Sequence, residues 1–226
     1  MEMSADFAVQ RAMMIEGQLR TRDVNYVPLL EAMRDIPREA FVPGPRKSLA
    51  YMDEDLAIRL ADGGRPARFL MEPAQFARLV QLARVKSSDL VLDVGCATGY
   101  SAAVLSRMAS FVVALECDPD LAETASATLA QLDCLNVTVV TGDLEKGHPD
   151  EGPYDVVMLG GAVDYVPDAL LQQLAEGGRL VAVIGEGNAA RAHLFIKENG
   201  FVSSRPDFNA AVKRLPGFRE EAGFVF

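Results

Sequence analysis

From residue 90 onward, short apolar runs alternate with segments of helical character. The runs are continuously apolar, which is typical of strands buried on both faces. This alternation predicts a doubly wound, mostly parallel sheet with helices on both sides. The expected strands are residues 90–94, 111–116, 137–141, 154–159 and 178–184, and the expected helices are residues 101–108, 121–132 and 168–174. Residues 192–197 and 201–204 flank an Asn-Gly turn signal and predict an antiparallel hairpin after them.

The first 89 residues have a different character, with helical spacing but no clear strand. Apolar positions predict helices at residues 6–19, 25–33 and 76–82. Residues 51–73 show no sustained period and contain several Asp, Gly and Pro residues, so we expect an irregular segment long enough to suggest a function. The sequence therefore predicts two parts, residues 1–89 and residues 90–226.

Composition narrows the function classes. Hydrophobic residues make up 50% of the 226 residues, which is enough for a sizeable core. No apolar run reaches the roughly 18–20 residues that span a bilayer, and the N-terminus lacks the pattern of a secretion signal. Three cysteines are an odd number and have no zinc spacing. We therefore expect a reduced, cytoplasmic protein with no membrane partner.

The charge is unevenly placed along the chain. Residues 1–89 carry 13 basic and 13 acidic side chains, whereas residues 90–226 carry 9 basic and 19 acidic ones. The whole net charge of −10 therefore lies in the second part. Because binding to a phosphate backbone needs clustered Lys and Arg, this distribution argues against a nucleic-acid partner.

A glycine-containing turn joins the first expected strand to the helix after it. Asp93 lies near the end of this strand, and Gly95 and Gly99 follow in the pattern D-x-G-x-x-x-G. Glycines let such a turn bend tightly and approach a ligand closely. Doubly wound sheets bind their ligands at this edge, the carboxyl ends of the strands. A dinucleotide site would have G-x-G-x-x-G, but Ala97 stands two residues after Gly95, so the pattern favours another ligand.

Three carboxylates are placed where one ligand can meet them all. Asp93 suits a ligand with ammonium and sulfonium groups rather than a diphosphate, and this chemistry matches S-adenosyl-L-methionine. Glu116 ends the second expected strand, where an acid can accept both ribose hydroxyl protons. Asp143, next to Gly142 after the third strand, can accept from an adenine amino group. Since nicotinamide enzymes use the Glu116 position in the same way, an NAD-dependent oxidoreductase remains an alternative.

Stretches on both sides of this turn carry a family resemblance. They are residues 14–19, 32–43 and 50–53 upstream, and residues 100–105, 136–137, 142–143, 166–167 and 173–181 downstream. Through them the chain resembles the class I S-adenosylmethionine-dependent methyltransferases and, more closely, the protein-L-isoaspartate O-methyltransferase family. The resemblance implies a seven-stranded Rossmann-like fold. It makes residues 1–89 an N-terminal helical extension with the acceptor-side loop, and residues 90–226 the S-adenosylmethionine-binding domain.

The resemblance also implies which residues form the site. Cofactor contacts are expected at Leu70, Met71, Asp93, Gly95, Cys96, Ala97, Thr98, Gly99, Glu116, Cys117, Gly142, Asp143 and Leu144. The family's acceptor loop reads G-Q-T-I-S-Q-P, and its serine faces the reacting carboxylate. Residues 68–73 correspond to this loop and keep Pro73, but Met71 stands at the serine position, which is the candidate catalytic position.

The residues expected around the methyl acceptor depart from the family's pattern. A carboxylate acceptor, from a protein or a small molecule, is already ionised near pH 7 and needs neither a general base nor a metal. Met71 cannot donate a hydrogen bond, and Glu72 adds negative charge, so we expect weak or absent activity on isoaspartyl peptides. Arg65 and Arg68, with Glu72, are candidates for substrate binding. A cofactor-binding sensor or interaction module without catalysis is a further alternative.

Overall fold

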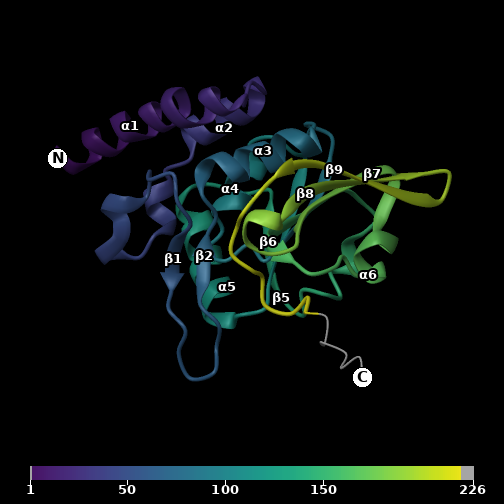
Figure 1. The fold of residues 1–226 in the computed structure, drawn as a ribbon. Coiled ribbons are helices and arrows are strands. Elements are labelled where there is room, and N and C mark those ends of the chain that lie inside the picture. Colours follow the sequence, from purple (N-terminus) through teal and green to yellow (C-terminus); the bar gives the residue numbers. More distant parts are fainter. Residues whose placement is uncertain (1, 220–226) are drawn as a thin grey trace.

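The chain forms one seven-stranded sheet with helices on both faces (Figure 1). The computed structural model describes residues 2–219, with side chains from residue 7 onward. The strand order is β5-β4-β3-β6-β7-β8-β9, in which β3 to β7 are parallel and the last two are antiparallel. The bounds are β3 (Leu90–Val94), β4 (Phe111–Glu116), β5 (Val137–Thr141), β6 (Tyr154–Val163), β7 (Leu174–Ile184), β8 (Arg191–Glu198) and β9 (Phe201–Asn209). The predicted fold class is confirmed.

Alternate residues of each central strand face opposite sides of the sheet. In β3, for example, Val91 faces the larger hydrophobic cluster and Leu92 faces the smaller one. The larger cluster contains side chains of α3 (Pro73–Ala83), α4 (Tyr100–Ser106) and α5 (Pro119–Gln131), and the smaller one contains Leu170 of α6 (Asp168–Gln172). Because both faces are buried, β3 and β4 are apolar at nearly every position, and the exceptions, Asp93 and Glu116, lie near the ends of these strands.

The start of α5 fixes the end of β4 in space. Asp118 caps this helix, accepting a hydrogen bond from the Leu121 backbone N–H at 3.2 Å, and Pro119 occupies the first turn. Both residues favour a helix start for local reasons: the carboxylate satisfies a free N–H, and proline has none to satisfy. Glu116 therefore lies between a buried strand and a capped helix, in a backbone that cannot easily shift.

The N-terminal part packs against the same core as the sheet. Its helices are α1 (Glu2–Met14) and α2 (Val27–Asp35), with a π-helical turn at η1 (Ile15–Leu19) and short 3-10 segments at η2 (Arg20–Arg22), η3 (Arg38–Phe41) and η4 (Gly44–Leu49). Ile15, Leu29 and Phe41 belong to one hydrophobic cluster with Val91 and Val112 of the sheet. The predicted boundary at residue 89 thus crosses a continuous core, and the division into two domains stays a prediction.

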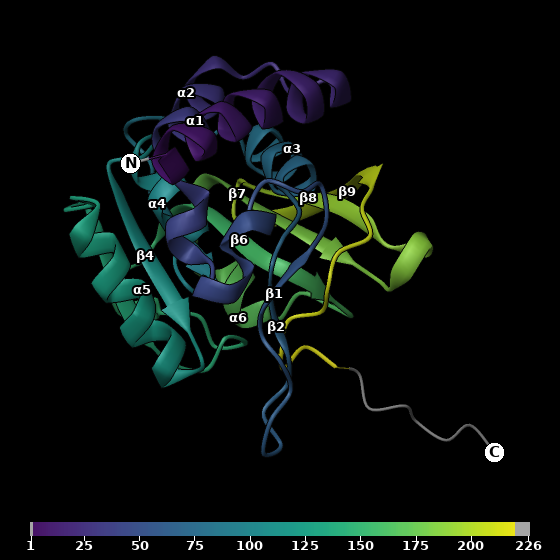
Figure 2. The same ribbon diagram turned by 90° about the vertical axis from the view of Figure 1, so that its left-hand side faces the viewer.

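The segment expected to be irregular contains a small antiparallel hairpin. Strands β1 (Leu56–Arg59) and β2 (Arg68–Leu70) pair only with each other and form a separate two-stranded sheet. Figure 2 shows this β1–β2 hairpin in front of the main sheet, with its connecting loop extending away from the body of the protein. The expectation of an irregular stretch was wrong for residues 56–59 and 68–70, because strands of four and three residues are too short to show a period.

The chain then returns along the end of β6. The Ala162 N–H donates to the Lys213 carbonyl at 2.9 Å, and the Leu215 N–H donates to the Ala162 carbonyl at 2.9 Å. The Asp164 N–H donates to the Phe218 carbonyl at 3.1 Å. This C-terminal segment, residues 210–218, therefore lies at the edge of the sheet where the parallel strands end. The Phe224-Val225-Phe226 ending lies outside the described residues.

Candidate cofactor site

The turn between β3 and α4 has a left-handed backbone at both of its glycines, a conformation that glycine adopts without strain. Gly95 and Gly99 have φ values of +82° and +95°, which L side chains rarely adopt. The Gly95 N–H donates to the Leu115 carbonyl of β4 at 2.8 Å and fixes the turn to the neighbouring strand. A Cβ at Gly95 would lie 2.6 Å from Leu215 of the C-terminal segment. Both the backbone angle and the space therefore select glycine.

Asp93 is buried in β3 with only half of its carboxylate satisfied. Oδ2 accepts a hydrogen bond from the Ser101 hydroxyl at 2.5 Å, whereas Oδ1 has no hydrogen-bond partner within residues 2–219. Burial raises the pKa of Asp93 to about 7, and the Ser101 hydrogen bond opposes this rise. An unpaired, buried carboxylate oxygen beside a glycine turn fits a cationic group of a ligand.

Glu116 is fully buried at the end of β4, and its carboxylate is saturated. Three backbone N–H groups donate to it: Ala97 at 2.8 Å, Cys117 at 2.9 Å and Asp118 at 3.0 Å. Arg68 of β2 adds a bidentate ion pair. Its Nη2 donates a hydrogen bond to Oε2 at 2.7 Å, and its Nη1 donates one to Oε1. Burial alone would raise the pKa of Glu116, but Arg68 and the N–H groups outweigh it and lower the pKa.

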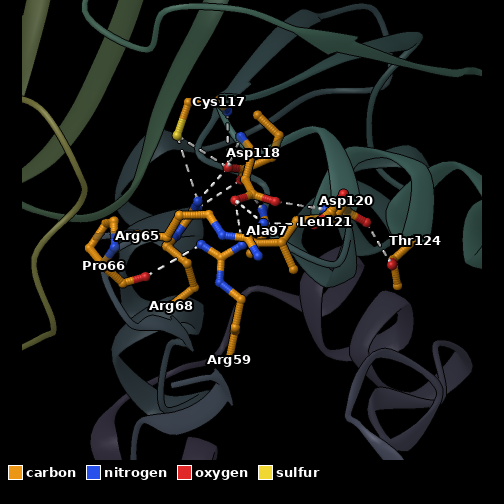
Figure 3. A network of polar contacts seen from close by, with 11 residues as sticks. Arg59, Arg65, Pro66, Arg68, Ala97, Cys117, Asp118, Asp120, Leu121 and Thr124 are labelled. Atoms are coloured by element: carbon orange, nitrogen blue, oxygen red, sulfur yellow. Dashed lines mark hydrogen bonds and ion pairs between the residues drawn. The ribbon is translucent and has the colours of Figure 1, made fainter. Parts of the chain in front are cut away.

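Two further ion pairs continue outward from this buried pair (Figure 3). Arg59 of β1 binds the Asp118 carboxylate, and Arg65 in the connecting loop binds Asp120 at 2.7 Å. The pairs become more exposed with distance from Glu116: Arg68 is 3% exposed, Arg59 19% and Arg65 49%. Arg65 and Arg68, which the sequence made candidates for substrate binding, thus bind carboxylates of this chain, as Arg59 does.

The residues expected near adenine follow β5, beside the end of β4. The Gly142 N–H donates to the Glu116 carbonyl at 3.0 Å, which brings the two strand ends together. Asp143 is exposed, with its carboxylate 3.1 Å from the Lys146 ammonium, and Leu144 is buried. Leu144 shares a hydrophobic cluster with Leu215 and Phe218 of the C-terminal segment.

The acceptor-side loop lies against the glycine turn. Leu70 and Met71 are buried. Met71, Cys96, Ala97 and Tyr100 line a small cavity with room for about one or two water molecules. The Met71 carbonyl accepts a hydrogen bond from Arg38 Nη2 at 2.7 Å.

Two hydrogen bonds to one carboxylate tie this loop to the C-terminal segment. The N–H groups of Glu72 and Lys213 both donate to Asp55, at 2.9 and 3.1 Å. Asp55 therefore joins two segments that are far apart in the sequence.

Several residues of the site were missed from the sequence. Arg38 holds the loop backbone and its guanidinium carbon lies 4.7 Å from the centre of the Tyr100 ring. Leu215 covers the glycine turn, and Asp55 joins the loop to the C-terminal segment. A local pattern marked none of these, because each contact joins distant segments. One signal was available: arginines 59, 65 and 68 and acids 116, 118 and 120 are two clusters of opposite charge.

The residues around Asp93 fit S-adenosylmethionine as they stand, and Glu116 fits it once Arg68 moves away. The orphaned Asp93 oxygen and the positive φ angles at Gly95 and Gly99 suit a ligand with an ammonium group lying close to the backbone. Glu116 has the position and chemistry for ribose hydroxyls, but Arg68 now occupies both oxygens. Neither in this site nor anywhere else in the described part of the chain does a group of three or more His, Cys, Asp or Glu side chains stand ready to hold a metal ion.

Comparison with known proteins agrees with this geometry. Residues 10–212 match the family model described as protein-L-isoaspartate(D-aspartate) O-methyltransferase. A protein-L-isoaspartate O-methyltransferase of Koribacter versatilis is 38% identical over 194 residues, covering 86% of this chain and 85% of that protein. One of Methanoculleus marisnigri is 36% identical, covering 87% of each chain. A solved structure of a protein-L-isoaspartate O-methyltransferase has a TM-score of 0.80 at 28% identity, covering 92% of this chain and 66% of its own.

A second solved structure supports the fold alone. It is a Plasmodium falciparum protein described as a protein-L-isoaspartate O-methyltransferase in complex with S-adenosyl-L-homocysteine, with a TM-score of 0.74 at 19% identity, covering 90% of this chain and 96% of its own.

The sheet order, the glycine turn and the strand-end carboxylates define a Rossmann-like, S-adenosylmethionine-dependent methyltransferase. Within this class, the chain belongs to the protein-L-isoaspartate O-methyltransferase family. The predicted cofactor, S-adenosyl-L-methionine, is confirmed by this membership, and the alternatives of an NAD-dependent oxidoreductase and a non-catalytic module find no support. No helix in residues 2–219 is long and apolar enough to cross a membrane.

Proposed function

We propose that the chain transfers the methyl group of S-adenosylmethionine to the carboxylate of isoaspartyl residues in proteins. The observation that carries this proposal is the family match over residues 10–212, supported by relatives that bear this name. The contacts expected for individual residues remain predictions. Among them, Asp93 is the one whose free, buried oxygen in the structure gives independent support.

The chemistry asks for alignment rather than proton transfer. The cofactor supplies an electrophilic methyl group, and the C–S bond breaks as a C–O bond forms to an acceptor oxygen. An acceptor carboxylate is ionised at neutral pH, so this chain need not remove a proton from it. Its own task is to hold two reactants in line and keep water away. The buried side chains of Leu70, Met71 and Tyr100 beside the glycine turn suit that task.

Met71 does not carry the consequence expected of it. Methionine at the serine position led us to expect weak isoaspartyl activity, but the comparisons give that doubt no support. In the structure the loop at this position is held through its backbone, because Arg38 donates to the Met71 carbonyl and the Glu72 N–H donates to Asp55. These two contacts position the loop without using the side chain of residue 71.

The test is a pair of peptides with the same sequence, one containing isoaspartate and the other aspartate. Labelled methyl groups should appear on the isoaspartyl peptide as a base-labile ester, in amounts unaffected by a chelator. Asp93→Ala should abolish both transfer and binding of S-adenosylhomocysteine in calorimetry. Asp150→Ala, which changes an exposed aspartate of the 3-10 turn η5 (Pro149–Glu151), serves as the matched control. Equal labelling of both peptides, or binding of NAD instead of S-adenosylhomocysteine, would refute the proposal.

A further inference from the structure

The carboxylate that should hold the ribose is fully engaged by the chain itself. A carboxylate accepts about four hydrogen bonds. Glu116 already receives five N–H contacts, three from the backbone and two from Arg68. The backbone donors belong to the turn and to the start of α5, so they stay in place. Of these five contacts, the two from Arg68 are the ones that can be released by a side-chain movement.

Arg68 belongs to a unit that shares no strand pairing with the main sheet. The β1–β2 hairpin pairs with no strand of the seven-stranded sheet. Its loop contains Gly63 and Gly64 with positive φ and no atom within 4 Å of a Cβ built at either. Three arginines of this hairpin, 59, 65 and 68, bind the acids 118, 120 and 116 at the β4–α5 junction. The rest of the protein therefore holds the hairpin through these ion pairs and through Ile58 and Leu70, which belong to the larger hydrophobic cluster, and not through strand pairing with the main sheet.

The energies of the three pairs differ with their burial. The Arg65–Asp120 pair is exposed, so water and salt weaken its attraction and it contributes little to holding the hairpin. The Arg68–Glu116 pair is buried on both sides, and the hydrogen bonding to Glu116 is complete. Its geometry raises the pKa of Arg68 despite the opposing effect of burial, so the guanidinium stays charged. The inner pair is therefore the one whose release limits opening.

We propose that the Arg68–Glu116 pair is an internal latch, in which the Arg68 guanidinium competes with the ribose hydroxyls of S-adenosylmethionine for the Glu116 carboxylate. Cofactor binding then requires Arg68 to withdraw, and the β1–β2 hairpin carries it. The position of the latch equilibrium sets the cofactor affinity of the free enzyme. This inference concerns regulation of the same site and rests on the proposed function for its cofactor.

Calorimetry with S-adenosylhomocysteine on the full chain tests the competition. Arg68→Gln removes the charge and leaves Glu116 with its three backbone donors, so the variant should fold. If the latch is closed in nine molecules of ten, the apparent affinity is reduced about tenfold, and Arg68→Gln should bind at least about tenfold more tightly than the wild type. Arg205→Gln, which changes an exposed arginine of β9 paired with Asp207, is the matched control and should bind like the wild type.

Hydrogen exchange of the free protein provides a readout without any cofactor. Backbone amides of residues 56–70 should exchange at least tenfold faster in Arg68→Gln than in the wild type or in Arg205→Gln. Arg68→Met, which keeps the length of the apolar stem, replaces Arg68→Gln if that variant does not fold.

The outcomes separate the two proposals. Weaker or unchanged binding in a folded Arg68 variant, while the wild type binds, overturns the latch and leaves the proposed function standing. If neither protein binds S-adenosylhomocysteine, the proposed function fails, and the exchange rates decide the latch: faster exchange in the variant supports it, and equal rates reject it.

Discussion

Two buried carboxylates at the same edge of one sheet meet opposite surroundings. Asp93 has one hydrogen bond and one free oxygen, and burial raises its pKa to about 7. Glu116 has five N–H contacts, and its pKa is lowered. The surroundings of Asp93 within residues 2–219 leave room for a cationic group of a ligand, whereas Glu116 already binds the Arg68 guanidinium. The comparison shows that a ligand-binding side chain can be shaped for its ligand and still be occupied by its own chain.

The largest expected effect comes from removing the charge of Glu116. Glu116→Gln leaves the buried Arg68 guanidinium without a counter-charge, and removal of one partner of a buried pair costs about 3–5 kcal/mol. We expect the free energy of unfolding, measured by urea denaturation, to fall by this amount.

The double variant Arg68→Met with Glu116→Gln is the control, because it removes the unpaired charge. It should recover at least half of the loss. A Glu116→Gln protein as stable as the wild type would show that Arg68 is free to reach solvent, contrary to a firmly closed latch.

A substitution at Gly160 tests how tightly the glycine turn beside Asp93 is packed. A Cβ at this position of β6 would lie 2.8 Å from the Gly95 carbonyl oxygen and 3.3 Å from that of Val94, and backbone atoms cannot turn aside as a side chain can. Gly160→Ala should therefore destabilise the fold by about 1–3 kcal/mol, the usual cost of overpacking, and weaken cofactor binding by displacing the turn. Thermal melts and calorimetry measure the two effects.

Gly44→Ala is the matched control, because nothing lies within 4 Å of a Cβ there and its φ is ordinary. It should change stability by less than about 0.5 kcal/mol. A Gly160→Ala protein that behaves like this control would mean that β3 and β6 separate more readily than their packing indicates.

The pKa of Asp93 sharpens the comparison through pH. Below about pH 7 the Asp93 carboxyl holds a proton and cannot attract an ammonium group, so S-adenosylhomocysteine should bind about tenfold more weakly at pH 6 than at pH 8. Folding shifts in the opposite direction: the raised pKa stabilises the folded state below about pH 4, and this contribution is lost as the pH rises to about 7.

Asp93→Asn separates this residue from every other titrating group. Its binding should be weak and nearly independent of pH between 6 and 8. Equal wild-type affinity at the two pH values would show that Asp93 does not meet the charged end of the ligand.

The sequence predicted this sheet better than it predicted the state of the site. The bounds of β3, β4 and β5 agree with the expected ones. Burial on both faces makes β3 and β4 nearly continuous apolar runs, and the edge strand β5 is recognisable from its β-branched Val and Thr residues. β6 continues past the expected end to Val163, where it pairs with β7 and with the C-terminal segment. That extension depends on partners distant in the sequence, and no local pattern records it.

The same limit applies to the two carboxylates. Asp93 and Glu116 were identified by their positions at strand ends, which are local properties. Their different states depend on Ser101 and Arg68, and Arg68 lies 48 residues before Glu116. Clusters of opposite charge in the hairpin and at the β4–α5 junction were visible in the sequence, but three arginines and three acids allow several pairings. Only the fold selects one of them.

The outermost pair gives the smallest expected effect and shows where the latch ends. Arg65 is 49% exposed and binds Asp120, which is itself 74% exposed, so water and salt weaken their attraction. Arg65→Gln should change the free energy of unfolding little and should raise the affinity for S-adenosylhomocysteine by less than twofold, with both effects absent at 500 mM salt. A change as large as that of Arg68→Gln would move the limiting contact from the buried inner pair to the exposed outer one, and the graded burial of the three arginines would no longer explain their roles.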